Sequence, residues 1–239
     1  MAELIVALDT PELDEALLLA EELSPEVGYF KLGLSLFYAA GPRAINEFKK
    51  LGASVFLDLK LHDIPAQVAG ACRVIGAYGV DMVTIHTLGG VEMMRAAKEG
   101  LTEGAAGAGL RAPLAIGVTV LTSLGAQDLE DLGMERPAMA QGPRLAKLAV
   151  EVGLNGVVAS AREIREIKKV TGKEFSIVTP GIRPHGSNAD DQKRITHPLA
   201  AVRAGADYLV VGRPITGDPT PREAAQKILD EMSHDEMSG

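Results

Sequence analysis

The segment that decides the fold reads Ser54-Val55-Phe56-Leu57-Asp58-Leu59-Lys60-Leu61-His62-Asp63-Ile64-Pro65. Its apolar start leads into two carboxylates and one ammonium within six residues. Alternate side chains of a strand point to one face, so a strand over 54–60 would place Asp58 and Lys60 together, with Asp63 just past its end. Charged groups at the end of a buried strand are unfavourable unless they are paired or used in function. We therefore interpret this cluster as a candidate site that the rest of the chain positions.

Seven other segments share the near-continuous hydrophobicity of this run, which is typical of strands buried on both faces. The eight predicted strands are Leu4–Leu8, Tyr29–Leu32, Ser54–Leu59, Met82–His86, Leu114–Val120, Gly156–Ser160, Phe175–Val178 and Tyr208–Val211. Segments with helical patterns lie between them. The predicted helices are 10–23, Arg43–Leu51, Ala66–Tyr78, Glu92–Glu103, Gly142–Val152, Ala161–Thr171, His197–Ala204 and Pro221–Met232. Glycines stand where several of these helices should end, at Gly52, Gly79, Gly153, Gly172 and Gly205.

Eight strands alternating with eight helices predict an α/β protein with one domain, a closed (β/α)8 TIM barrel over residues 1–232. The alternative is an open doubly wound sheet, which usually carries a glycine-rich dinucleotide turn after its first strand. Here the first strand runs into Ala7-Leu8-Asp9-Thr10-Pro11 without a glycine, which favours the barrel. Residues 233–239 are polar, and we expect them to form a short disordered tail.

The composition argues against several classes of protein. A net charge of −8, a pI near 5.2 and the absence of a Lys/Arg-rich block disfavour a nucleic-acid-binding surface. No stretch approaches the roughly 18 apolar residues of a membrane span, and the acidic start Met1-Ala2-Glu3 is unlike a secretory signal. The lone Cys72 cannot form an internal disulfide and fits a reducing cytosol. We therefore expect a cytoplasmic protein with no nucleic-acid or membrane partner.

In a barrel of this kind, the chemistry lies at the C-terminal ends of the strands. Polar residues recur at those ends, and their joint placement is more informative than any one of them. The candidates are Asp9, Lys31, Asp58, Lys60, Asp63, His86, Thr122, Pro180, Arg183, Gly212 and Arg213.

Two of the loops have features of a phosphate site. Gly212-Arg213 follows the eighth strand, where barrels often bind phosphate through backbone N–H groups and an arginine. Arg183 lies on the loop after the seventh strand, and a surface role remains the alternative for each arginine. The long polar segment Arg183–Arg194 is either a lid or a plain surface loop. In a closing lid, Gln192 could reach a phosphate or a base amide.

The charged cluster has two possible explanations. Asp58, Lys60 and Asp63 could form a structural ion network, which is common in proteins. Adding Asp9 and Lys31 gives two cations among three anions at one barrel mouth, and neighbouring carboxylates would keep Lys60 protonated. A protonated lysine is a ready proton donor, and a carboxylate placed against a substrate carboxylate would repel it.

The remaining reactive side chains suggest no further chemistry. The histidines show no metal-ligand spacing, so we predict no metal site. His62 is expected to support the motif, and His86 to be a supporting residue rather than a base. Cys72 falls in a predicted helix, where it should pack in the core.

The combined motifs resemble those of the bacterial orotidine 5'-phosphate decarboxylase family, in order and over nearly the whole chain. The motifs are Val6–Asp9, Lys31–Gly33, Asp58-x-Lys60-x-x-Asp63-Ile64-Pro65, Leu121–Ser123, Pro180–Arg183, Asp191–Arg194 and Val211–Ile215. Asp-x-Lys-x-x-Asp alone is shared with related decarboxylases and synthases. The resemblance implies decarboxylation of orotidine 5'-monophosphate to uridine 5'-monophosphate, the last step of de novo UMP biosynthesis, with no metal and no organic cofactor.

The resemblance also implies roles for individual residues. Lys60 would donate the proton to C6 of the pyrimidine, while Asp58 would lie against the departing carboxylate and hold Lys60. Asp63 would enter the site of the second subunit of a homodimer with shared active sites. Lys31 and Asp9 would bind the ribose hydroxyls, and Lys31 would also pair with Asp58.

The remaining implied contacts complete a substrate-binding set. Thr122 would contact the pyrimidine, and the phosphate would be held by Arg183, Gln192, Gly212 and Arg213. Ile64 and Pro180 belong to the same set by their motifs. Gln67 stands where the family often has a threonine that contacts the ribose across the dimer interface, so the geometry of that contact should differ.

Two rival functions remain open. A keto-sugar-phosphate decarboxylase or hexulose-phosphate synthase would share the Asp-x-Lys-x-x-Asp core but use Mg2+. A non-catalytic barrel that binds a phosphorylated metabolite would bind without turnover. The Leu121-Thr122-Ser123 turn and Gln192 favour the nucleotide.

Overall fold

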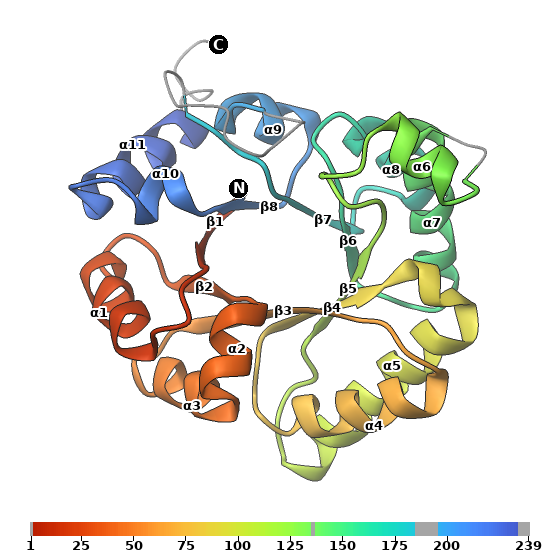
Figure 1. Ribbon diagram of the computed structural model, residues 1–239, viewed down its shortest axis with the longest axis horizontal. Helices are drawn as coiled ribbons and strands as arrows, with labels where there is room; N and C mark the ends of the chain where they lie inside the picture. The colour runs from red at the N-terminus through yellow and green to blue at the C-terminus, as the bar shows by residue number, and fades with distance from the viewer. Residues whose placement is uncertain (1, 135–136, 185–195, 234–239) are drawn as a thin grey trace.

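The computed structural model describes residues 2–134, 137–184 and 196–233. In that part of the chain, eight parallel strands close into a barrel in sequence order (Figure 1). The strands are β1 (Glu3–Leu8), β2 (Tyr29–Leu32), β3 (Ser54–Leu61), β4 (Met82–His86), β5 (Leu114–Val118), β6 (Gly156–Val158), β7 (Ser176–Thr179) and β8 (Tyr208–Val211). The pairing of β8 with β1 confirms the predicted closed barrel and excludes the open sheet.

Helices surround the barrel on its outer side (Figure 1). They are α1 (Leu13–Leu23), α2 (Leu34–Ala40), α3 (Pro42–Lys50), α4 (Pro65–Gly76), α5 (Gly90–Gly107), α6 (Ala126–Asp131), α7 (Ala138–Glu151), α8 (Ile164–Thr171), α9 (Pro198–Ala204), α10 (Arg213–Thr216) and α11 (Pro221–Ser233), with the 3-10 turn η1 (Thr87–Gly89). In the described ranges, none of these helices is long and apolar enough to cross a membrane. The predicted polar tail lies outside the described residues, except for Ser233.

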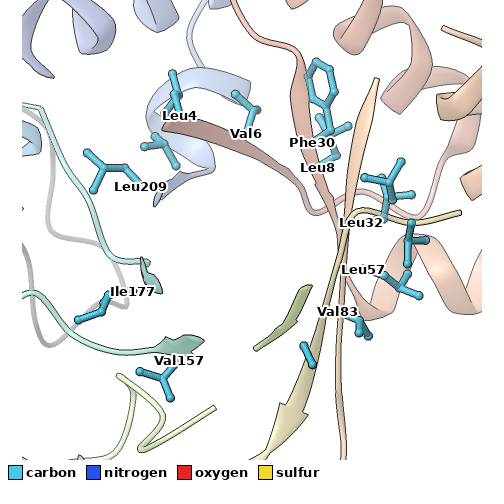
Figure 2. Close-up of a cluster of buried hydrophobic side chains, with 14 of the residues drawn as sticks. Leu4, Val6, Leu8, Phe30, Leu32, Leu57, Val83, Val157, Ile177 and Leu209 are labelled. Atoms are coloured by element: carbon cyan, nitrogen blue, oxygen red, sulfur yellow. The ribbon is translucent and has the colours of Figure 1, made fainter. Parts of the chain in front are cut away.

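The strands are buried on both faces, as their composition predicts. Along β1, the side chains of Leu4, Val6 and Leu8 belong to the core between strands and helices (Figure 2). The side chains of Ile5 and Ala7 belong instead to a second core inside the barrel. The inner core consists of Ile5, Ala7, Tyr29, Phe56, Met82, Ile116, Val178 and Val210.

This alternation determines which side chains lie at the barrel mouth. Counting two residues onward from Ala7, Tyr29, Phe56 and Met82 leads to Asp9, Lys31, Asp58 and Thr84. Successive residues of a strand point to opposite faces, so these four polar side chains share the inner face above the apolar core. The two-residue period of the strands therefore places polar and charged side chains at the C-terminal end of the barrel, directly above its apolar interior.

Three short helical segments were not predicted, namely α2, α6 and α10. Each has seven residues or fewer, too short to show a helical period. Helix α5 is longer than predicted, because Gly100 and Gly104 pack against α4 and do not end the helix. A Cβ atom at Gly104 would overlap the backbone carbonyl of Arg73, so only glycine allows the two helices to approach this closely.

Candidate active site

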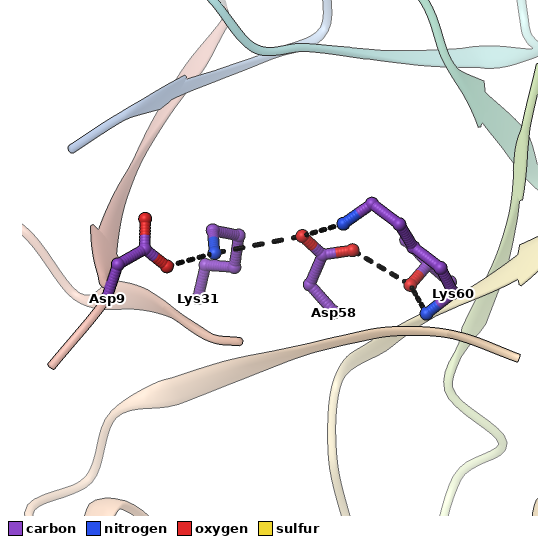
Figure 3. Close-up of polar contacts among 5 residues, drawn as sticks. Asp9, Lys31, Asp58 and Lys60 are labelled. Carbon is purple, nitrogen blue, oxygen red and sulfur yellow. Dashed lines mark hydrogen bonds and ion pairs between the residues drawn. The ribbon is translucent and has the colours of Figure 1, made fainter. Parts of the chain in front are cut away.

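Four charged side chains form a continuous chain at the barrel mouth (Figure 3). Asp9 directly follows β1, Lys31 lies on β2, and Asp58 and Lys60 lie on β3. Lys31 Nζ lies 2.7 Å from Asp9 Oδ1 and 3.7 Å from Asp58 Oδ2. Lys60 Nζ donates a hydrogen bond of 2.8 Å to the same Asp58 oxygen. Four of the five charged residues predicted to meet at the barrel mouth do so, and their charges alternate in sign along the chain. The fifth, Asp63, is exposed and joins none of these ion pairs.

The two inner members of this chain are the most buried. The side chains of Lys31 and Asp58 are each 11% exposed, whereas those of Lys60 and Asp9 are 34% and 62% exposed. Burial would raise the pKa of Asp58, but the charges of Lys31 and Lys60 and hydrogen bonds from Lys60 and Thr84 outweigh it and lower that pKa. Asp58 is therefore ionised at neutral pH, because its charge is fully paired.

Lys60 has an unusual backbone conformation. Its φ of 50° makes it the single non-glycine residue with positive φ in the described ranges. The β3–β4 register shifts at this point, since Leu57 pairs with Val83 and Leu61 with Ile85. The predicted strand over 54–60 is confirmed, but its backbone is irregular at Lys60, where Asp58 and Lys60 still meet. A left-handed conformation costs a non-glycine residue about 1–3 kcal/mol, so surrounding contacts must stabilise it.

Thr84 supplies such a contact, which was not predicted from the sequence. The Lys60 backbone N–H donates to Thr84 Oγ1 at 2.8 Å, and Thr84 Oγ1 donates to Asp58 Oδ1 at 2.9 Å. The signal was present in the sequence, because Thr84 is a polar residue on the same face of β4 as Met82 and His86.

Gly33 leaves room for the ion pair between Asp9 and Lys31. A Cβ atom on Gly33 would lie 3.0 Å from Asp9 Oδ1 and 3.1 Å from Lys31 Nζ. Both distances are shorter than ordinary van der Waals contact, so any larger side chain would push the two charged groups apart. This explains why glycine directly follows β2 in the Lys31-Leu32-Gly33 motif.

A cavity of about 580 Å³ opens beside the charged chain. It lies between the ends of β1 and β2 on one side and those of β7 and β8 on the other. Six of the predicted site residues line it: Asp9, Lys31, Pro180, Arg183, Gly212 and Arg213. The size suits a small ligand, because ligand pockets commonly measure about 300–1,000 Å³.

Arg183 is a buried cation at the edge of this cavity. Its Nη1 donates to the carbonyl of Ile182 at 3.0 Å, while its buried Nε has no hydrogen-bond partner among the residues that the structure describes. Among the ion pairs of the described residues, none joins a carboxylate to Arg183. A buried guanidinium without a counter-charge favours the binding of an anion.

The other predicted site residues do not line this cavity. Asp58 and Lys60 are absent from its lining and are connected to it through Lys31. Asp63, Ile64 and Gln67 are exposed, and Asp63 Oδ1 accepts a hydrogen bond from the Ile64 backbone N–H. Thr122 is half-buried beyond β5 and is absent from the cavity lining. Gln192 lies outside the described residues.

Two histidines lie next to Lys60. The rings of His62 and His86 stack with centroids 5.0 Å apart. Burial, then the charges of His62 and Lys60, lower the pKa of His86 to about 4, so this imidazole is neutral at pH 7. Its Nδ1 accepts a hydrogen bond from the Leu88 backbone N–H, which agrees with a supporting role. In the described ranges, no group of three or more His, Cys, Asp or Glu side chains is placed to hold a metal ion.

Comparisons with known proteins agree with this geometry. A family model described as "Orotidine 5'-phosphate decarboxylase / HUMPS family" matches residues 2–228. The chain is 51% identical over 231 residues to an orotidine 5'-phosphate decarboxylase of Moorella thermoacetica, covering 96% of this chain and 92% of that protein. It is 46% identical to the protein of that name from Citrifermentans bemidjiense, with 96% and 95% covered. Among solved structures, the orotidine 5'-phosphate decarboxylase of Lactobacillus acidophilus superimposes with a TM-score of 0.86 at 34% identity, covering 98% of this chain and 100% of that chain.

Proposed function

The chain belongs to the orotidine 5'-phosphate decarboxylase / HUMPS family, and from this premise we propose that it decarboxylates orotidine 5'-monophosphate by direct protonation at C6. The product is uridine 5'-monophosphate, so the enzyme acts in pyrimidine biosynthesis. The observation that carries the chemical part of the proposal is the chain Asp9–Lys31–Asp58–Lys60 beside a cavity with two arginines.

The chemical step follows from the charges. The bond from C6 to the carboxylate breaks, CO2 leaves, and the electron pair stays at C6. Asp58, held ionised, lies against the substrate carboxylate and raises the free energy of the bound ground state. The Lys60 ammonium stabilises the developing negative charge at C6 and then transfers a proton from Nζ to that carbon. Lys60 is partly exposed, so it can regain its proton from solvent after the product leaves.

The phosphate and ribose would be held by the residues around the cavity. Arg183 and Arg213 provide positive charge for the phosphate, with the Gly212 backbone and Pro180 beside them. Asp9 and Lys31 face the same cavity and would bind the ribose hydroxyls. Gln192 completes the proposed phosphate contacts from outside the described residues, and Thr122 is proposed to contact the pyrimidine.

We further propose a cytoplasmic homodimer in which each site uses residues of both subunits. Asp63 would enter the site of the second subunit, and Ile64 and Gln67 would contact its substrate. All three side chains are exposed in the single chain, and Ile64 is an apolar residue with 63% of its surface in solvent. Their exposure leaves all three side chains accessible to a second chain.

The rival functions are less well supported. The family description also names HUMPS proteins, but both curated relatives above carry the decarboxylase name. The test is the loss of pyrimidine absorbance on incubation with orotidine 5'-monophosphate, with and without a chelator. We expect equal rates in both. Turnover only with Mg2+ would favour the Mg-dependent rival, and tight binding without turnover would favour a non-catalytic barrel.

A further inference from the structure

We propose that Thr84 is a positioning residue for the proton transfer, because its hydroxyl holds both the backbone of Lys60 and the carboxylate of Asp58. The inference rests on the function proposed above and deepens it. Thr84 lies on β4, whereas the charged chain Asp9–Lys31–Asp58–Lys60 comes from β1 to β3. It therefore connects the reacting pair to a strand that carries no member of that chain.

The hydrogen bonds of Thr84 fix both partners at once. Its side chain is fully buried, so no bulk water competes for the hydroxyl. The single hydroxyl proton is directed to Asp58 Oδ1 at 2.9 Å, because an ionised carboxylate can only accept. The lone pairs of Oγ1 then accept the Lys60 backbone N–H at 2.8 Å. A hydroxyl can donate to one of these groups and accept from the other at the same time, which an aliphatic side chain of the same size cannot do.

The carboxylate of Asp58 is held at both oxygens as a result. Oδ2 faces Lys60 Nζ at 2.8 Å and Lys31 Nζ at 3.7 Å, while Oδ1 is held by Thr84. Without the hydroxyl, the carboxylate could rotate about its last torsion and follow the lysines. The hydroxyl therefore fixes the plane of the carboxylate relative to the substrate.

The backbone contact matters because of the conformation of Lys60. At φ 50° its N–H points to the Thr84 side chain, and the register shift removes regular pairing with β4 at this residue. If Oγ1 were absent, this N–H would be buried without its partner, and the chain would gain by returning to extended φ. That change would move the Lys60 side chain, including the ammonium that delivers the proton.

The experiment compares Thr84→Val with Thr84→Ser and a matched control. Valine keeps the shape of threonine without the hydroxyl, whereas serine keeps the hydroxyl. The control is Thr87→Val, because Thr87 is equally buried and its hydroxyl donates to the Val118 carbonyl, away from the charged chain. We measure kcat and KM for orotidine 5'-monophosphate and the affinity for uridine 5'-monophosphate.

For Thr84→Val we expect kcat to fall about 10–100-fold, the range set by loss of a hydrogen bond to a charged group, with KM and affinity within about threefold. Thr84→Ser should retain kcat within about fivefold, and Thr87→Val should keep kcat even if it lowers Tm. A crystal structure of Thr84→Val should show Lys60 with negative φ. If Thr84→Val does not fold, Thr84→Ala is measured in its place with the same expectation.

Several outcomes would overturn the inference. They are a kcat for Thr84→Val within twofold of the parent, an equal loss of kcat in Thr84→Ser, or an equal loss in Thr87→Val. Failure of the proposed function looks different, because the parent protein itself would then not consume orotidine 5'-monophosphate. In that case the φ of Lys60 in the Thr84→Val structure still decides whether the hydroxyl holds the backbone.

Discussion

Asp58 shows how a single residue can keep its charge inside a barrel. Its side chain is almost fully buried, yet its pKa lies below the ordinary value, because two lysines and a hydroxyl offset the effect of burial. Removing any one partner would leave part of that charge uncompensated. Each charge of this site is therefore stable inside the barrel only because its neighbours are present.

His86 gives a prediction about pH and stability. Its pKa in the folded protein is lowered from 6.5 to about 4 by burial, then by His62 and Lys60, so the unfolded chain takes up this proton first as the pH falls. The neutral imidazole therefore stabilises the fold fully above about pH 6.5, and this contribution is lost as the pH falls towards 4. His86→Asn should reduce the fall in unfolding free energy over that interval, measured by denaturant titration. An unchanged pH dependence would contradict this account.

At the scale of the element, β2 and the glycine after it place the cation that joins Asp9 to Asp58. Because a Cβ atom on Gly33 would crowd both members of the Asp9–Lys31 pair, Gly33→Ala should displace Lys31. We expect kcat/KM to fall by roughly 10-fold, the effect of about 1.4 kcal/mol in the transition state. The matched control is Gly28→Ala just before β2, where a Cβ atom meets nothing within 4 Å. Equal activities of the two variants would refute the crowding argument.

The packing of α4 against α5 supports the segment that follows the charged strand. A Cβ atom at Gly104 would overlap the Arg73 backbone, whereas one at Gly107 on the same helix would meet nothing within 4 Å. Gly104→Ala should therefore lower the free energy of unfolding by about 1–3 kcal/mol through overpacking, while Gly107→Ala should not lower it. Chemical denaturation of both variants checks this. A Gly104→Ala protein as stable as Gly107→Ala would show that α4 can shift freely.

The elements also show what sequence alone can and cannot predict. Near-continuous hydrophobicity identified all eight strands of the described barrel, and strand parity brought Asp9, Lys31 and Asp58 to one face. Parity could not predict the left-handed backbone of Lys60, where the backbone N–H donates to Thr84, a residue distant in sequence. It also could not place Asp63, Ile64 and Gln67, since their proposed contacts lie on a second chain.

At the scale of the whole molecule, the single chain carries only part of the proposed site. The cavity is lined from the ends of β1, β2, β7 and β8, while the exposed residues Asp63, Ile64 and Gln67 are absent from its lining. A closed barrel presents the ends of all its strands at one rim, so a second barrel docked at that rim could supply the missing side. The cavity and the proposed docking surface both lie at this rim, because every strand of the barrel runs in the same direction.

Mixing two inactive variants tests the shared site. Lys60→Ala and Asp63→Ala should each be nearly inactive alone, but a mixed dimer would contain one site with both native residues. Random exchange in an equal mixture should restore about a quarter of the parent activity, as expected for a two-fold symmetric dimer. Subunit exchange is confirmed with differently tagged chains. Exchange without recovery would mean that Asp63 acts within its own subunit.

The proposal that Lys60 delivers the proton is tested most directly by the turnover of Lys60→Ala under saturating orotidine 5'-monophosphate. The matched control is Lys50→Ala, which removes an exposed lysine of α3 far from the charged chain. Loss of the proton donor should lower kcat by at least about 10²–10⁴-fold, with uridine 5'-monophosphate still bound and the protein folded. A Lys60→Ala protein that decarboxylates within tenfold of the parent would contradict the mechanism.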